Sequence, residues 1–254
     1  MPKISAAIIT YNEEKNIERC INSLLNVADE IVIVDSGSND KTQEIALALG
    51  AKVVINKFEG HIQQKNFAVT QTLNDWVISL DADEALSSEL KKSILKVKNN
   101  LKGNGYKFNR LSNYCGKWIK HCGWYPDTKL RLFKKGQGSW KGKNPHDKYI
   151  LDRGKETHIK GDLLHYTFYD VSEHRAQIVK FSNAAAQSLF ELNKKSNWVL
   201  IIVKTIFKFI RNYFLKLGFL DGIKGFHICR LTAHSTYLRY YKLLKLQKNN
   251  VQTS

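Results

Sequence analysis

Three carboxylates stand close together directly after a short apolar segment. Asp81, Asp83 and Glu84 follow Trp76–Leu80, and a short apolar run bounded by polar residues is typical of a buried strand whose carboxyl end can border a ligand site. Carboxylate oxygens suit Mg²⁺ and Mn²⁺, which usually share their coordination with substrate phosphates. The segment therefore predicts a divalent ion at a strand end, with a diphosphate on its far side. The alternative is an acidic turn in which Asp81 or Asp83 caps a helix that begins near Leu86.

The elements before this segment alternate between strands and helices. Apolar runs predict strands over residues 4–9, 30–35, 52–55 and 76–80. Helical spacing of apolar residues predicts helices capped by Asn12 and by Asp40, and a third helix over residues 62–73. This alternation predicts an α/β fold with a doubly wound, mostly parallel sheet flanked by helices.

Asp35 ends the second predicted strand, so it would lie at the same sheet edge as Asp81 and Asp83. The turn-forming sequence Ser36–Asp40 follows it, and a purely turn-forming role is the alternative for this aspartate. The chain has neither the glycine fingerprint of dinucleotide-binding folds nor a Walker phosphate loop. Phosphates are therefore expected to be held by a metal ion and basic residues.

The composition points to an anionic partner. The chain has 254 residues, a formal net charge of +17 and a pI near 9.6, and the excess of positive charge lies mostly after Lys91. Such a balance suits nucleic acid, an acidic membrane face or phosphorylated substrates. No nucleic-acid-binding motif occurs in the sequence. Four cysteines without metal-site spacing, and an N-terminus without a signal-peptide pattern, favour a reduced cytoplasmic protein.

Three motifs resemble, in order and spacing, the nucleotide-sugar motifs of family 2 glycosyltransferases: Thr10–Glu13, Val34–Thr42 and Leu80–Glu84. That resemblance implies the GT-A fold and transfer with inversion at the anomeric carbon. More narrowly, Gly60–Asn66 and the region from Gly123 to Phe133 resemble lipopolysaccharide-core glucosyltransferases of the WaaE type. The similarity runs over most of the chain and is weakest in the tail.

The resemblance also implies roles for single residues. It implies that Thr10, Tyr11 and Glu13 line the base and ribose of a UDP-sugar. It implies that Asp35 accepts a hydrogen bond from the uracil and that Asp81 lies against the ribose. Lys65 and Asn66 are implied to lie near the nucleotide sugar. Asp83 is implied as the ligand of Mg²⁺ or Mn²⁺. His165 is the candidate for a second ligand, because some GT-A enzymes bring a late histidine back to the metal. His146 is a weaker candidate, and a structural role is the alternative for both histidines.

Inverting transfer needs one general base near the acceptor hydroxyl and no covalent intermediate. The candidates are Asp147, Asp127 and Glu84. Asp147 is preferred because GT-A enzymes resemble one another in placing the base after a strand, at the start of a helix. The WaaE-like pattern has glutamate at that place, so the carboxylate here is one methylene shorter. The alternative for Asp147 and Asp127 is a cap or an ion pair with a lysine.

Aromatic residues are dense on both sides of Asp127, between residues 118 and 140. One or two of Trp118, Trp124, Tyr125 and Trp140 could stack on an acceptor sugar, although burial in the core is the commoner role of tryptophan. Arg131 could reach a phosphate or pair with an acid in the sheet.

The chain becomes wholly helical from about Val171, which predicts a catalytic domain over residues 1–170 and a helical region over residues 171–254. One stripe of this region is apolar: Trp198, Val199, Ile202, Val203, Ile206, Phe207, Ile210 and Phe214. Lys204, Lys208, Arg211 and Lys216 lie away from it, and four cations in about twenty residues argue against a membrane-spanning helix. The pattern is typical of a basic amphipathic helix on an anionic membrane surface. The alternative is packing against the catalytic domain or another subunit. A last helix is predicted over residues 228–246.

These features predict an inverting, metal-dependent transfer of a hexose, with glucose as the first candidate, from a UDP-sugar to a lipid-linked saccharide such as lipopolysaccharide inner core. The expected location is the inner face of the cell membrane, where the protein would be peripheral. Polyprenyl phosphate or another surface glycan is the alternative acceptor. A non-catalytic nucleotide- or nucleic-acid-binding protein is the alternative from a different class.

Overall fold

The computed structural model describes residues 1–143 and 146–252. The chain divides into two compact units, the first made of Met1–Leu111 with Asp127–His165 and the second of Ser112–Pro126 with Tyr166–Ser254. The second unit thus begins close to the predicted boundary at residue 170. It also takes in Ser112–Pro126, which the sequence analysis assigned to the first, because Tyr114, Ile119 and Cys122 share a buried cluster with residues of the C-terminal helix.

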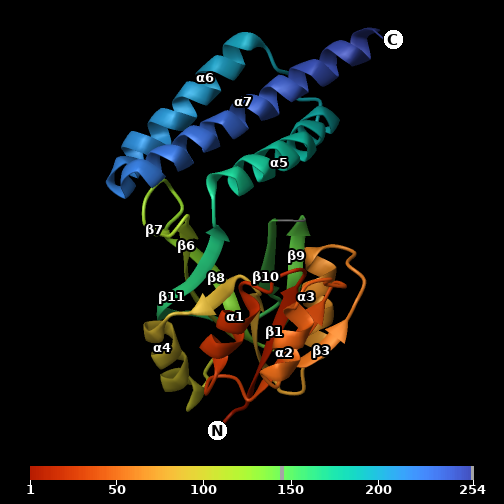
Figure 1. Cartoon of the computed structure of the whole chain (residues 1–254), viewed down its shortest axis with the longest axis vertical. Helices are drawn as coiled ribbons and strands as arrows, with labels where there is room; N and C mark the ends of the chain where they lie inside the picture. Colours follow the sequence, from red (N-terminus) through yellow and green to blue (C-terminus); the bar gives the residue numbers. More distant parts are fainter. Residues whose placement is uncertain (144–145, 253–254) are drawn as a thin grey trace. The chain divides into compact units, whose positions relative to one another are not determined.

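The first unit holds the sheet and its covering helices (Figure 1). In chain order its elements are β1 (Ile4–Thr10), α1 (Ile17–Leu24), β2 (Glu30–Asp35), α2 (Thr42–Ala48), β3 (Lys52–Ile55), α3 (His61–Thr70), β4 (Trp76–Asp81), β5 (Glu84–Leu86), α4 (Ser88–Lys98), β6 (Gly105–Tyr114), β8 (Asp127–Lys134), β9 (Gly138–Lys143), β10 (His146–Leu151) and β11 (Glu156–Phe168). Strands β6 and β11 begin in this unit and end in the second.

The main sheet has a parallel half and an antiparallel half. Its strands follow the order β3-β2-β1-β4-β8-β6-β11-β5. The first four are parallel, and β8 joins β4 in antiparallel orientation. The predicted α/β class and the four predicted strands are confirmed. The other half includes β5, β6, β8 and β11, and the sequence predicted strand segments at residues 129–133 and 162–166 but not their antiparallel pairing.

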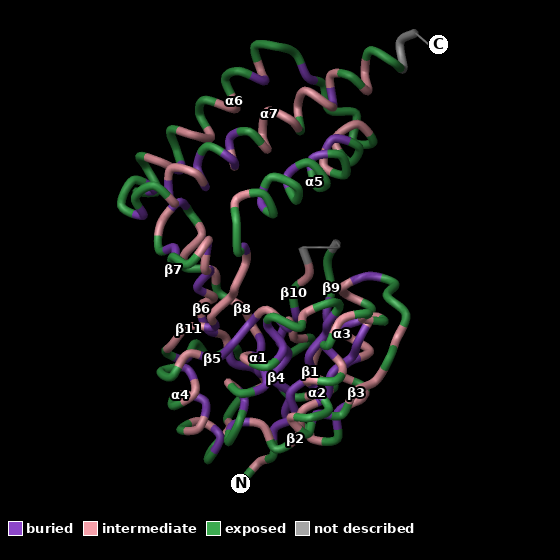
Figure 2. The backbone as a smooth tube through the Cα atoms, in the orientation of Figure 1, coloured by how far each residue is buried: buried purple, intermediate pink, exposed green. Residues whose placement is uncertain are grey.

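The central parallel strands β1 and β4 are buried on both faces, which is why they are mostly apolar, whereas the edge strand β3 is partly exposed. All seven residues of β1 are buried, as expected for a central strand covered by helices on each side. One core cluster packs β1 and β4 against α1 and α4 through residues such as Ile21 and Leu90. A second cluster on the other face includes Ala68 of α3. Figure 2 shows this buried centre beneath exposed helix surfaces.

The predicted helix cap Asn12 is wrong, and so is the alternative that Asp81 or Asp83 caps a helix. Asn12 lies in the left-handed region at φ 54°, and α1 begins only at Ile17. The Asn12 side chain instead accepts a hydrogen bond from the backbone N–H of Asn39, which ties two loops together. The helix after the acidic segment is capped by Ser87, whose Oγ accepts from the N–H of Leu90. Asp81 and Asp83 are therefore not helix caps.

The second unit consists of β7 (Lys117–Ile119), α5 (Val171–Glu191), α6 (Trp198–Ile210), the short helices η1 (Arg211–Leu215) and η2 (Gly218–Asp221), and α7 (Gly222–Gln252). Asp170 and Glu173 form a capping box at the start of α5. The last helix begins at Gly222 rather than at residue 228. Gly225 therefore lies inside the helix, at a place where the Gly218 backbone approaches too closely for a side chain. None of the described helices is long and apolar enough to cross a membrane.

Candidate active site

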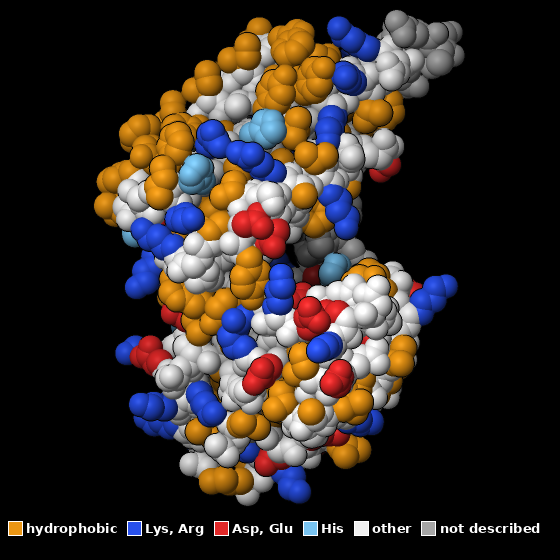
Figure 3. All heavy atoms as spheres, in the orientation of Figure 1, with side chains coloured by type: hydrophobic (Ala, Val, Ile, Leu, Met, Phe, Trp, Pro, Cys, Tyr) orange, Lys and Arg blue, Asp and Glu red, His pale blue; other side chains and the backbone are white. Residues whose placement is uncertain are grey.

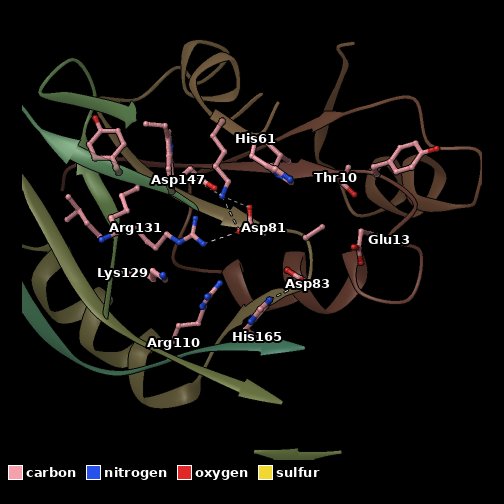
Figure 4. Close-up of a pocket in the computed structure, with 18 of the residues that line it drawn as sticks. Thr10, Glu13, His61, Asp81, Asp83, Arg110, Lys129, Arg131, Asp147 and His165 are labelled. Carbon is pink, nitrogen blue, oxygen red and sulfur yellow. Dashed lines mark hydrogen bonds and ion pairs between the residues drawn. The ribbon is translucent and has the colours of Figure 1, made fainter. Parts of the chain in front are cut away.

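A cavity of about 1020 Å³ opens in the first unit beside the carboxyl ends of β1 and β4. The strand order reverses between these two strands, and ligands of open α/β sheets bind at such a point. Residue Ile9 pairs with Asp81 and Thr10 pairs with Asp35, so the ends of three strands lie side by side. Figure 4 shows side chains from this edge and from β8 pointing into the cavity.

Asp81 is the centre of a buried charge network. Lys65 Nζ lies 3.0 Å from its Oδ1, and Arg131 Nη2 lies 3.0 Å from its Oδ2. Burial tends to raise the pKa of Asp81, but Lys65 and Arg131 outweigh that effect and hold the pKa well below its ordinary value. Arg131 also lies 2.8 Å from Glu84, whose side chain is fully buried. Asp81 is therefore a permanent anion held in place by two cations.

Asp83 and His165 meet on the same cavity wall. Nε2 of His165 lies 3.1 Å from Oδ2 of Asp83. Burial alone would lower the pKa of His165, but the Asp83 carboxylate outweighs burial and raises it. The sequence placed both residues at the metal, and the fold brings them together although 82 positions separate them.

The pair fits a divalent ion that is shared with a substrate. Within the described part of the chain, no group of three or more histidine, cysteine or acidic side chains could hold a metal by itself. One carboxylate and one imidazole leave the remaining positions to water and phosphate oxygens, which is how Mg²⁺ is usually held in phosphate-binding sites. The side chain of His146 lies outside the described residues, so its candidacy as a ligand stays untested.

The wall opposite the strand ends is built on Trp140. Asn66 donates a hydrogen bond to the carbonyl of Trp140 and accepts one from its N–H, at 3.0 and 2.9 Å. The indole ring then lies 4.5 Å from the Lys65 ammonium, a cation–π contact. Asn66 is thus a positioning residue in this structure and is not on the cavity wall.

Several polar groups of the cavity have no partner. Of the described residues, Thr10, Arg131, Trp140 and Tyr149 each have a buried side-chain oxygen or nitrogen without a hydrogen-bond partner, and all four line this cavity. Leaving such a group unsatisfied costs on the order of 1–3 kcal/mol. Their convergence on one space indicates a site built for a polar ligand.

Asp35 differs from its implied role. Its side chain is fully buried and accepts hydrogen bonds from the N–H groups of Gly37 and Ser38, from the Ser38 hydroxyl and from the Gln43 amide. Three of these bonds fall on Oδ1 and one, from the Ser38 hydroxyl, on Oδ2. Asp35 therefore forms the turn after β2, the alternative that the sequence allowed, and it does not line the cavity.

Glu13 and Tyr11 line the cavity near Thr10, as the motif implied. Burial raises the pKa of Glu13 to about 7, in spite of a hydrogen bond from Asn16, and the negative charge of Asp83 adds to the rise. A carboxylate kept in a costly position inside a cavity is a mark of a functional site.

Replacing Glu13 by glutamine is expected to raise the free energy of unfolding at pH 8 by about 3 kcal/mol, since the pKa of Glu13 rises from 4.5 to about 7 on folding. The pKa of Glu13 is higher in the folded state than its ordinary value of 4.5, so the folded protein binds more protons between pH 4.5 and 7 and loses stability as pH rises through that range. Glutamine does not titrate. Denaturant titrations of both proteins at pH 5 and pH 8 measure the difference. The same pH slope in both proteins would contradict the shifted pKa.

The three candidate bases have different surroundings. Asp147 lines the cavity, and its Oδ2 lies 2.8 Å from Lys65 Nζ. It belongs to β10, in a hairpin with β9, so its predicted place at the start of a helix is wrong. Asp127 pairs with Arg110 and Lys129, at 2.8 and 2.9 Å, and is not on the cavity wall.

The pKa of Asp127 argues further against it as a base. Burial tends to raise the pKa of Asp127, but Arg110 and Lys129 outweigh burial and hold it below its ordinary value. Glu84 is fully buried against Arg131 and accepts a bond from the Asp81 N–H, so it is a structural residue. Of the three, Asp147 is the one that a ligand in the cavity can reach.

Sequence reasoning missed part of the cavity wall. Phe58, His61, Lys107 and Tyr149 also line it, and the Phe58 and His61 rings meet edge to face at 5.1 Å. For His61, the preceding Gly60 is the feature of the sequence that could have indicated a special position. Gly60 has a φ of 141° and directly precedes α3, whose first residue, His61, lines the cavity. Lys107 and Tyr149 carry no such local signal.

Comparison with known proteins gives the same assignment as the motifs. Residues 5–149 match the family model for glycosyl transferase family 2. The whole chain is 33% identical, over 267 aligned residues, to an uncharacterized glycosyltransferase of Rickettsia typhi and covers 91% of it. It is 28% identical to the lipopolysaccharide core biosynthesis glycosyltransferase LpsC of Rhizobium meliloti, with 94% of each chain covered.

Among solved structures, a partial match is found with glucosyl-3-phosphoglycerate synthase from Mycobacterium tuberculosis in complex with Mn²⁺ and UDP-glucose. It covers 44% of each chain at 25% identity and a TM-score of 0.37. The family model matches more than half of the chain, and the Rickettsia relative is similar along all of it. The chain therefore belongs to glycosyltransferase family 2 and has the α/β fold of its GT-A members.

Proposed function

We propose that this glycosyltransferase moves a hexose, with glucose as the first candidate, from a UDP-sugar to a hydroxyl of a lipid-linked saccharide, with inversion at the anomeric carbon. The observation that carries the proposal is the set of partnerless polar groups around one cavity, next to the Asp83–His165 pair. A cavity of about 1020 Å³ lies at the upper end of the range for small-molecule sites, which favours a large donor together with the end of an acceptor.

The donor is proposed to lie along the strand ends. Thr10, Tyr11 and Glu13 line the end of the cavity that would take the base and ribose. Asp81 would accept a hydrogen bond from the ribose, since Lys65 and Arg131 keep it anionic and immobile. The partnerless nitrogens of Arg131 are suited to a phosphate oxygen, because guanidinium groups present several donors in a fixed plane. The uracil would meet the turn that Asp35 shapes rather than its carboxylate.

Asp83 and His165 are proposed to hold Mg²⁺ or Mn²⁺. When bound, such an ion neutralises the charge that develops on the leaving diphosphate. The protein's own part is to present one oxygen and one nitrogen ligand at the cavity wall and to leave the rest of the coordination to the donor.

Asp147 is proposed as the general base. It would take the proton of the acceptor hydroxyl as that oxygen attacks the anomeric carbon from the face opposite the departing UDP. One carboxylate is sufficient for this step because no covalent intermediate forms. Trp140, packed against Lys65, supplies an apolar wall beside the base.

The acceptor is proposed to be lipid-linked because LpsC, a relative along nearly the whole chain, is named for lipopolysaccharide core biosynthesis. We accordingly place the reaction at the inner face of the cell membrane, with the protein as a peripheral component. Polyprenyl phosphate and other surface glycans are the alternatives that an acceptor panel separates. A homo-oligomer formed through the C-terminal helices is the alternative use of that region.

The test is release of UDP from a panel of UDP-hexoses, with and without Mn²⁺ or Mg²⁺. Slow release from one donor, dependent on the metal, is the expected result. Asp83→Asn is the control and should release UDP at the metal-free rate while keeping the unfolding transition of the wild-type protein. Release that is equal with metal, without metal and in Asp83→Asn would overturn the metal assignment. If no donor is turned over and calorimetry detects no UDP binding, the donor assignment is overturned as well.

A further inference from the structure

An apolar face covers α6 and the turn that follows it. Among the described residues, 25 large hydrophobic side chains are exposed, and 13 of them lie between Trp198 and Ile223. We call these 13 the apolar face: Trp198, Val199, Ile202, Val203, Ile206, Phe207, Ile210, Phe214, Leu215, Leu217, Phe219, Leu220 and Ile223. Hydrophobic side chains gather along α6 in Figure 3. A concentration of this kind marks an interaction surface.

The fold of the second unit does not need this face. Helix α6 packs on α7 through its other side, where Ile201 is fully buried and Lys204 Nζ lies 5.2 Å from the Tyr240 ring. Val199, Leu215 and Ile223 are 72%, 69% and 66% exposed, although nothing in the helix spacing prevents polar residues there. The apolar face is therefore available for a partner outside the chain.

Two exposed cations, Arg211 and Lys216, adjoin the apolar face next to Ile210 and Leu215, whereas Lys204 and Lys208 lie on the side of α6 that faces α7, where Lys204 Nζ is 5.2 Å from the Tyr240 ring. Within the described part of the chain, none of Lys204, Lys208, Arg211 and Lys216 forms a salt bridge. No acidic residue occurs between Glu191 and Asp221. Burial lowers the pKa of Lys208, and the positive charge of Arg211 adds to the effect. A partner that brings negative charge to the border of an apolar surface would complement this region.

The net positive charge of the whole second unit further limits which kinds of partner can bind the apolar face. Residues 112–126 and 166–254 contain 16 lysines and arginines and four acidic residues. A second copy of this chain on the apolar face would bring like-charged borders together, because a two-fold contact pairs the same patch with itself. A bilayer with anionic lipids instead offers an apolar interior below a layer of phosphates.

The length of α6 fixes how it can lie. Its 13 residues span about 20 Å at 1.5 Å per residue, less than the roughly 30 Å hydrocarbon core. A helix with one apolar side and bordering cations lies in the plane of the interface, with the apolar side below the phosphates. The turn of η1 and η2 adds exposed apolar side chains such as Leu215 and Phe219.

We propose that the apolar face is a membrane-docking surface, on which α6 lies parallel to an anionic bilayer while the exposed cations Arg211 and Lys216 meet lipid phosphates. This deepens the proposed function, because it names the surface that would bring the enzyme to a lipid-linked acceptor. The docking itself depends only on the second unit.

The experiment is co-sedimentation of the full chain with vesicles of phosphatidylcholine alone and of phosphatidylcholine with about one third phosphatidylglycerol. Binding is expected to the anionic vesicles and to weaken with salt. Ile202→Glu/Ile206→Glu should lower the partition coefficient at least tenfold. Arg211→Gln/Lys216→Gln should lower it about fivefold per cation removed, on anionic vesicles only.

The matched control is Leu47→Glu/Leu73→Glu, which changes two hydrophobic residues of the first unit that are even more exposed than Ile202 and Ile206, and which should bind as wild type. Circular dichroism confirms that each variant keeps its helices. Equal vesicle binding by all variants overturns the proposal. So does a stable dimer in light scattering that Ile202→Glu/Ile206→Glu dissociates while vesicle binding is unchanged. UDP release without vesicles is measured in parallel. If vesicle binding fails but UDP release is intact, the proposed function stands and the docking is overturned. If UDP release fails but vesicle binding is as expected, the docking stands and the proposed function is overturned.

Discussion

Asp147→Asn is expected to lower the rate of sugar transfer by about 10²–10⁴-fold, the usual contribution of a general base. Asparagine keeps the shape of the side chain and an oxygen that can accept the bond from Lys65, 2.8 Å away, but its amide cannot take up a proton. The donor site lies on other residues, so the KM for the UDP-sugar should change little. Initial rates with an acceptor that the wild-type protein glycosylates, at varied donor concentration, measure both effects.

Asp127→Asn is the matched control for this experiment. It removes the same charge from a carboxylate that is paired with Arg110 and Lys129 and does not line the cavity. Its transfer rate should stay within about tenfold of wild type, since Asp127 does not itself reach the cavity and its partly exposed ion pairs with Arg110 and Lys129 contribute little. A large loss in Asp127→Asn together with a small one in Asp147→Asn would reverse the assignment of the base.

Arg131→Met is expected to lower the free energy of unfolding by about 3–5 kcal/mol, the usual cost of leaving a buried charge without its partner. The Arg131 side chain is 3% exposed and that of Glu84 is fully buried, 2.8 Å away. Asp81 would keep Lys65, but Glu84 would keep only Arg110, at 3.4 Å. Denaturant unfolding at neutral pH, followed by circular dichroism, measures the loss.

Two further variants separate burial of charge from loss of any ion pair. Lys141→Met removes an exposed pair, since the side chains of Lys141 and Asp152 are 49% and 60% exposed, and should cost less than about 1 kcal/mol. Arg131→Met/Glu84→Gln removes both buried charges and should recover part of the stability that Arg131→Met loses. If Arg131→Met costs no more than Lys141→Met, the buried pair does not stabilise the site.

Local patterns in the sequence determined the parallel half of the fold and one side of the site. The strands Ile4–Thr10 and Trp76–Asp81 carry continuous apolar runs that a sheet covered on both faces buries. Carboxylates directly after a strand must lie at its carboxyl edge, so the positions of Asp81 and Asp83 followed from the chain order. The motifs then led to the family because each is short and local.

Tertiary structure alone decided how the two halves of the chain meet at the site. The contacts of Lys65 with Asp147 and of His165 with Asp83 each join residues 82 positions apart, and Asn66 and Trp140 are 74 apart. Such contacts depend on which strands become neighbours, and the periodicity of a single segment does not contain that information. The resemblance implied that Lys65, Asn66 and His165 matter, but not which residues they touch.

For Asp35 and Asn12, too, the sequence did not determine which groups the side chain contacts. The Asp35 carboxylate is buried and accepts bonds from Gly37, Ser38 and Gln43. The Asn12 side chain is tied to the loop at Asn39 instead of capping a helix. In both cases the sequence determined that a polar side chain stands at a strand end. The arrangement of the surrounding backbone N–H groups decided what that side chain binds, because a hydrogen-bond acceptor pairs with the donors that the fold places within reach.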